Sequence, residues 1–165
     1  IVDLDLAAWR TNFKANLDAV FLTTKKVLPW MQDAKKGSIV NVASVVGLKG
    51  VAYMSAYGAA KAGLINFTRA TAVEAAPHVR VNSIIPGAVM TPATERAIPD
   101  DKLMEVTVNT IPLKRIAQPA ELAKPIAFLL SSDASFITGA SLVVDGGKTA
   151  DLNAGNYEQV HPEFQ

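Results

Sequence analysis

The stretch Ser38-Ile-Val-Asn-Val-Ala-Ser44 decides the fold of this chain, because a short β-branched run directly after a glycine predicts a strand. The alanine-rich segment from Ser55 to Ala75 follows it and predicts a helix. A second apolar run, Val79 to Ile85, predicts another strand, which Pro86-Gly87 ends. A strand, a helix and a strand in this order indicate two parallel strands joined by a helical crossover.

The same alternation continues in both directions. Apolar residues at helical spacing predict one helix from about Asp5 to Met31. The segment from Ala88 to Gln118 has weak periodicity, and we expect a long loop that acts as a lid or binding element. Pro119 to Leu130 predicts a third helix, which Pro125 is expected to kink, and Ser141 to Asp145 predicts a third strand. We therefore expect an α/β sheet covered on both faces, with ligands at the carboxyl ends of its strands.

The composition narrows the range of functions. The chain has 165 residues, half of them hydrophobic, which is enough for one compact domain. Its net charge of +1 gives no electrostatic reason to expect nucleic acid or an anionic membrane as a partner. It has no cysteine and only two histidines, so we expect no disulfide framework and no metal site. The lack of cysteine fits a reducing compartment, and we expect a cytoplasmic location.

Tyr57 and Lys61 form the most informative pair of side chains. Residues four apart share one face of a helix, so a phenol and an ammonium are expected side by side. A neighbouring cation stabilises a phenolate, which suits proton exchange with an alcohol or carbonyl oxygen. Ser44 ends the preceding strand and could face them. The alternative is a surface helix that carries an aromatic ring and a solvated lysine.

Several motifs in register resemble the short-chain dehydrogenase/reductase family. The resemblance covers residues 1–147 in the family's order and spacing, and it implies a Rossmann-like doubly wound parallel sheet, here partial, with about three strands and flanking helices. The motifs are Asn16-Leu-Asp-Ala-Val-Phe21, Asn41-Val-Ala-Ser44, Tyr57-Gly-Ala-Ala-Lys61-Ala62, Arg80-Val-Asn-Ser-Ile-Ile-Pro86-Gly87, Pro112-Leu-Lys-Arg115 and Ile137-Thr-Gly-Ala-Ser-Leu-Val-Val-Asp-Gly-Gly147.

The resemblance implies four catalytic residues. Tyr57 would be the general acid/base, and Lys61 would support it and hydrogen-bond the nicotinamide ribose. Ser44 would hold the substrate oxygen. Asn16 would interrupt its helix and hold a water that links Lys61 to solvent, although an asparagine there could equally be a plain surface amide. Together these residues imply hydride transfer between NAD or NADP and a small-molecule alcohol or ketone.

The resemblance also implies a nicotinamide site after the second strand. Pro86 and Gly87 would form a wall against the ring, and Val89 and Thr91 with the nearby backbone would take its carboxamide, while a plain turn is the simpler alternative. The substrate pocket would be built from residues 88–118, and it would be completed by Val45, Val46, Met54 and the tail from Tyr157 to Phe164.

The family's first part is not found in this sequence. That part contains a Thr-Gly-x-x-x-Gly-x-Gly turn, whose following helix takes the pyrophosphate, and a residue that selects NAD or NADP. We expect residues 1–147 to be the catalytic carboxyl-terminal portion of one dinucleotide-binding domain and residues 148–165 a polar tail. The chain could be a truncated piece, could work with a separate amino-terminal piece, or could be an inactive dimerisation or scaffold module. The family resemblance implies a homodimer or homotetramer, in which the first two helices pair.

Overall fold

Parallel strands form the centre of the molecule. The computed structural model describes residues 1–152, and within them three strands form one sheet in the order β1 (Gly37–Val42), β2 (Val79–Pro86) and β3 (Ser141–Val144). Both neighbouring pairs are parallel. The predicted partial α/β sheet is therefore confirmed, with β1 ending before the expected Ser44.

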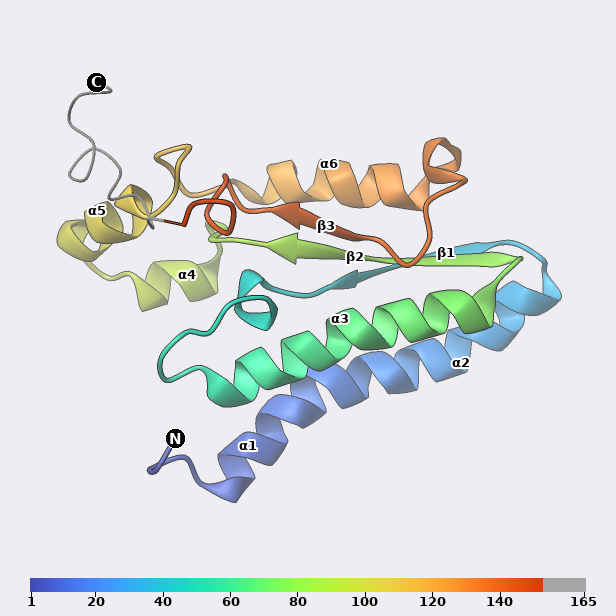
Figure 1. Cartoon of the computed structure of the whole chain (residues 1–165), viewed down its shortest axis with the longest axis horizontal. Helices are drawn as coiled ribbons and strands as arrows, with labels where there is room; N and C mark the ends of the chain where they lie inside the picture. Colours follow the sequence, from blue (N-terminus) through green and yellow to red (C-terminus); the bar gives the residue numbers. More distant parts are fainter. Residues whose placement is uncertain (153–165) are drawn as a thin grey trace.

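Helices cover both faces of this sheet. α2 (Ala19–Asp33) and α3 (Ser55–Ala75) lie on one face, and α6 (Pro119–Leu130) lies on the other (Figure 1). The bounds of α3 and α6 are those that the sequence predicts. α6 begins with proline at its first position, and the helix continues through Pro125 to Leu130.

The expected single helix over residues 5–31 is divided in two, which corrects that prediction. α1 (Leu6–Phe13) begins at Asp5, whose carboxylate accepts a hydrogen bond of 2.8 Å from the backbone N–H of Ala8. A π-helical turn over Lys14–Asp18 then separates α1 from α2. Hydrophobic periodicity alone does not locate a π turn, but the interruption at Asn16 that the family resemblance implies falls within this one.

The core lies between α3 and the sheet. One cluster joins Leu64 and Ile65 of α3 to Ala43 and Ile85, and a second joins the end of α3 to the start of β2. Between the two, the buried Asn41 side chain donates a hydrogen bond of 2.9 Å to the hydroxyl of Thr68. This polar contact fixes how α3 lies across the sheet, because a buried amide is unfavourable without a partner.

The segment from Ala88 to Gln118 is not a structureless loop, and that prediction was wrong. It contains α4 (Pro92–Ala97) and α5 (Asp101–Asn109), which lie beyond the carboxyl ends of the strands (Figure 1). Both helices begin with a side-chain cap: Thr91 accepts a hydrogen bond from the N–H of Thr94, and Asp100 accepts one from that of Leu103. These caps are visible in the sequence, but helices of six and nine residues are easily overlooked in a proline-containing segment.

No helix in residues 1–152 is both long enough and apolar enough to span a bilayer. The same part of the chain contains no cluster of three or more His, Cys, Asp or Glu side chains that could hold a metal ion.

Candidate active site

The first turns of α3 carry the tyrosine and lysine that the sequence singles out. The Nζ atom of Lys61 lies 5.7 Å from the centroid of the Tyr57 ring, so the two side chains are neighbours on one face of the helix. Ser44 lies two residues beyond β1 and begins a short 3₁₀ turn, Val45–Gly47, in which its hydroxyl accepts a hydrogen bond from the N–H of Val46. The turn brings the serine to the same end of the sheet as Tyr57.

Glycines allow the 3₁₀ turn to lie directly on α3. A Cβ atom added at Gly58 would lie 3.0 Å from the carbonyl oxygen of Val46, and one at Gly47 would lie 2.8 Å from the backbone carbon of Lys61. The small residues between Tyr57 and Lys61 thus accommodate this chain's own turn. This close contact fixes the position of Ser44 relative to α3.

Lys61 is partly buried and has a defined partner. Its Nζ atom donates a hydrogen bond of 2.9 Å to the carbonyl oxygen of Val42, the last residue of β1. Burial lowers the pKa of Lys61 below its ordinary value, because desolvation disfavours the ammonium form. The amino group is therefore held next to Tyr57 at the strand terminus.

An open hollow joins these residues to the end of β2. Its volume is about 760 Å³, including space open to solvent. Seven of the eight predicted site residues line it: Ser44, Tyr57, Lys61, Pro86, Gly87, Val89 and Thr91. The structure thus brings together residues separated by up to 47 positions, at the edge of the sheet where ligands bind in such folds.

Asn16 is the predicted site residue that does not line this hollow. It lies in the π-helical turn, and its side-chain amide donates a hydrogen bond of 3.1 Å to the carbonyl oxygen of Asn12. The turn packs on α3 near Lys61, since a Cβ atom added at Gly63 would lie 3.1 Å from the Leu17 side chain. The helix is interrupted at Asn16, but its link to Lys61 through water stays a prediction.

The segment after β2 is held close to β3. The N–H of Gly87 donates a hydrogen bond of 3.0 Å to the carbonyl oxygen of Val144, and a Cβ atom at Gly87 would lie 2.8 Å from the Cα atom of Asp145. Any larger residue would push the two segments apart. Hydrogen bonds from Thr149 and Gly147 hold the pKa of the Asp145 carboxyl below its usual value despite its burial, which raises it.

Sequence reasoning missed part of the lining of this hollow. Pro119, Leu122 and Ile126 of α6 also line the hollow, and their spacing of three and four residues marks them as one helix face. Val46 and Met54 line a neighbouring groove on α3, and their place in the substrate pocket stays a prediction. The predicted contribution of Tyr157 to Phe164 lies outside the described residues.

Comparison with known proteins shows to which family this α/β fold belongs. A family model described as "Enoyl-(Acyl carrier protein) reductase" matches residues 1–149. The chain is 41% identical over 152 residues to cyclopentanol dehydrogenase of Comamonas testosteroni, covering 92% of this chain and 61% of that protein. It belongs to the short-chain dehydrogenase/reductase family.

Solved structures give the same result. A protein described as "short chain dehydrogenase/reductase family protein" matches with a TM-score of 0.84 and 37% identity, over 91% of this chain and 61% of that one. A 4-hydroxyisoleucine dehydrogenase mutant complexed with NADH and succinate matches with a TM-score of 0.88 and 36% identity, over 92% and 63%. The chain thus spans about three fifths of the length of the relatives that it matches.

Proposed function

We propose that the protein is an NAD- or NADP-dependent oxidoreductase that interconverts an alcohol and a ketone, with Tyr57 as the general acid/base. The observation that carries this proposal is the shared hollow, in which Ser44, Tyr57 and Lys61 meet the segment after β2. The named relatives support it, since one is a cyclopentanol dehydrogenase and another is a dehydrogenase complexed with NADH.

The residues present fit the nicotinamide end of such a cofactor. Pro86 and Gly87 carry no bulky side chain and line the hollow together with Val89 and Thr91. The cofactor, when bound, would supply the hydride chemistry. The sequence lacks the glycine-rich turn that holds a pyrophosphate in this family, so the proposal applies to the whole protein.

Each catalytic side chain has a separate task in this proposal. The Ser44 hydroxyl donates a hydrogen bond to the substrate oxygen and stabilises the negative charge that develops on it. The Tyr57 hydroxyl gives its proton to that oxygen during reduction and takes it back during oxidation. The Lys61 ammonium stabilises the phenolate between these steps, and it is also proposed to bind the ribose. Asn16 is proposed to hold a water that returns protons to Lys61.

The test is turnover by the protein expressed from its complete gene. Cyclic secondary alcohols, with cyclopentanol first, are mixed with NAD or with NADP, and the absorbance of the reduced nicotinamide is followed. We expect substrate-dependent reduction of at least one cofactor. The proposal would be refuted by a protein that binds neither cofactor, reduces neither NAD nor NADP with any alcohol, and oxidises neither NADH nor NADPH with the matching ketones.

A second candidate is an association module, because apolar side chains are exposed on α2. Phe21 is 45%, Leu22 61% and Trp30 64% exposed. The outer edge of β1 also has no strand partner among the described residues. Both features favour burial against another surface. We propose that the chain forms homodimers or homotetramers, which pair through the first two predicted helices, residues 5–31 and 55–75. Sedimentation velocity of the wild type and of Trp30→Glu tests this.

A further inference from the structure

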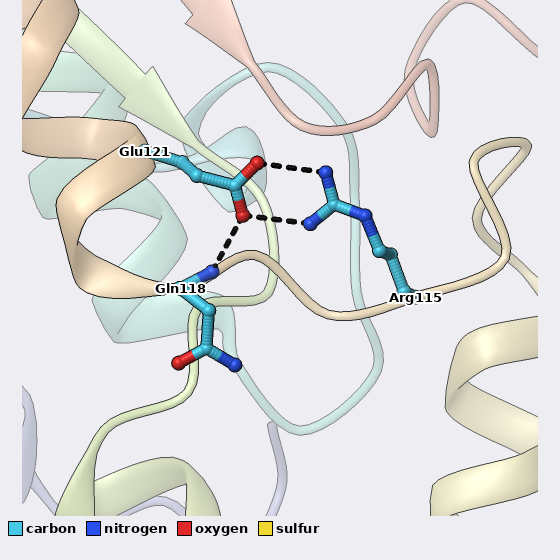
Figure 2. Close-up of polar contacts among 3 residues, drawn as sticks. All are labelled: Arg115, Gln118 and Glu121. Carbon is cyan, nitrogen blue, oxygen red and sulfur yellow. Dashed lines mark hydrogen bonds and ion pairs between the residues drawn. The ribbon is translucent and has the colours of Figure 1, made fainter.

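An ion pair next to α6 has no part in the proposed chemistry. The guanidinium of Arg115 forms two parallel hydrogen bonds with the carboxylate of Glu121, of 2.6 and 2.7 Å (Figure 2). The same carboxylate accepts a third bond, of 2.9 Å, from the backbone N–H of Gln118. The three contacts close a loop over residues 115–121, so the backbone between Arg115 and α6 is held at both ends.

Ala117 lies inside this closed loop and pairs with the segment after β2. The N–H of Met90 donates a hydrogen bond of 2.8 Å to the carbonyl oxygen of Ala117, and the N–H of Ala117 donates one of 3.1 Å to that of Ala88. Val89 and Ala117 thus form a short parallel bridge. The two hydrogen bonds involve Ala88 and Met90, the neighbours of Val89, and they hold Val89 beside Ala117.

Val89 belongs to the wall of the hollow that contains Tyr57 and Lys61. Its carbonyl oxygen accepts a hydrogen bond of 2.6 Å from the hydroxyl of Thr94, which in turn contacts Thr91 at 3.0 Å. The bridge to Ala117 is therefore the outer support of the segment that is proposed to take the nicotinamide carboxamide.

The pair contributes little to global stability, because both side chains are exposed, by 54% and 38%. Its bidentate geometry still fixes an orientation that a single hydrogen bond would not. The hydrogen bonds from Arg115 and from the Gln118 backbone lower the pKa of Glu121 to about 2, so the carboxylate stays ionised in ordinary buffers.

We infer that Arg115 and Glu121 are positioning residues for hydride transfer, acting through Ala117 on the nicotinamide-facing segment Val89–Thr91. This inference rests on the proposed function. Neither side chain lines the hollow, so neither is assigned a contact with substrate or cofactor. Their loss should misplace the ring relative to the substrate carbon and leave proton transfer by Tyr57 intact.

The test compares Glu121→Gln, Arg115→Lys and Arg115→Met with the wild type, in the protein from its complete gene. Substrate is cyclopentanol, or another secondary alcohol that the wild type oxidises, with and without deuterium on the reacting carbon. We expect kcat to fall about tenfold or more in Glu121→Gln and Arg115→Met, since a displacement of about 1 Å can reduce the rate about 10²-fold. The deuterium isotope effect on kcat should rise, and the apparent pKa values of the rate profile should not move.

Two comparisons separate positioning from general damage. Arg115→Lys keeps the positive charge but cannot form the two parallel hydrogen bonds of the guanidinium. Its kcat should therefore lie between those of the wild type and Arg115→Met. Lys124→Gln removes an exposed charge from the same helix and should leave kcat and the isotope effect unchanged. Thermal unfolding of each variant shows whether any loss of rate merely follows a loss of folded protein.

The possible outcomes distinguish failure of this inference from failure of the proposed function. An active wild type whose variants keep the wild-type kcat and isotope effect would overturn the inference alone. The same holds if the rate falls only in proportion to the folded fraction. A wild type that neither binds nor reduces NAD or NADP would refute the proposed function, and this inference with it.

Discussion

The amino group of Lys61 donates a hydrogen bond of 2.9 Å to the carbonyl oxygen of Val42, so the first turns of α3 are tied to the last residue of β1. Ser44 lies two residues further along the chain, and Tyr57 lies one helical turn before the lysine. This contact, together with the packing of the 3₁₀ turn on α3, therefore holds the three side chains at one end of the sheet. It also explains why a charged group is tolerated at a partly buried position, since the carbonyl replaces part of its lost hydration.

Lys61→Met should abolish turnover without lowering the free energy of unfolding at neutral pH. Burial lowers the pKa of Lys61, which means that the fold disfavours its charged form. The wild type should accordingly gain stability relative to the variant as the pH rises from the lowered pKa toward the ordinary value of 10.5. Denaturant unfolding at several pH values measures this. A wild type that loses stability relative to Lys61→Met as the pH rises over that range would contradict the prediction.

Gly47→Ala should destabilise the protein by about 1–3 kcal/mol, because the new methyl group would overlap the α3 backbone. The displaced 3₁₀ turn should also move Ser44 and reduce kcat. Gly50→Ala is the matched control in the same loop, since a Cβ atom there meets nothing within 4 Å. Equal stabilities of the two variants would show that the turn does not lie on α3 as described.

Thr68→Val should cost about 1–3 kcal/mol, because it leaves the buried amide of Asn41 without its partner. Thr23→Val is the control: both hydroxyls donate to the carbonyl four residues earlier, but Thr23 is exposed and supports no buried group. Its effect should stay within about 0.5 kcal/mol. Urea unfolding of both variants measures the difference, and similar losses would count against the polar contact under α3.

Glu121→Gln should lower stability only slightly at neutral pH, because the side chains of both Arg115 and Glu121 are exposed, and not at all in strong acid. The Glu121 pKa falls from 4.5 to about 2 on folding, chiefly through its hydrogen bonds with Arg115. A lowered carboxyl pKa stabilises the fold above about pH 4.5, and that contribution is lost as the pH falls toward 2. Thermal unfolding against pH should therefore show wild type and variant converging in acid. Parallel curves down to pH 2 would mean that the ion pair does not form in solution.

The long elements could be predicted because several local signals agree. For Ser55–Ala75 the alanine content, the length and the following Pro77 all favour one helix, and for Pro119–Leu130 the opening proline marks the start. The two helices between Ala88 and Gln118 were missed because they are only six and nine residues long and lie among prolines. Their caps, Thr91 and Asp100, and the apolar face of α5 could have indicated them.

The site was predictable to the extent that its residues end strands or begin helices. Ser44, Tyr57 and Pro86 sit at such positions, and parallel strands bring them to one edge. The role of α6 could not be seen from local pattern, because Leu122 reaches the hollow only through packing across the sheet. The bridge between Val89 and Ala117 is likewise a tertiary contact between distant segments, which no spacing rule indicates.

The most direct test of the central claim is the turnover of Tyr57→Phe in the protein expressed from its complete gene. The substitution removes one hydroxyl and keeps the ring, so the fold and cofactor binding should persist. We predict a fall in kcat of about 10²-fold to 10⁴-fold, the usual contribution of a positioned acid/base. An unchanged thermal unfolding midpoint would show that the loss is chemical. A variant that keeps the wild-type rate would contradict the assignment of Tyr57 as the proton-transfer group.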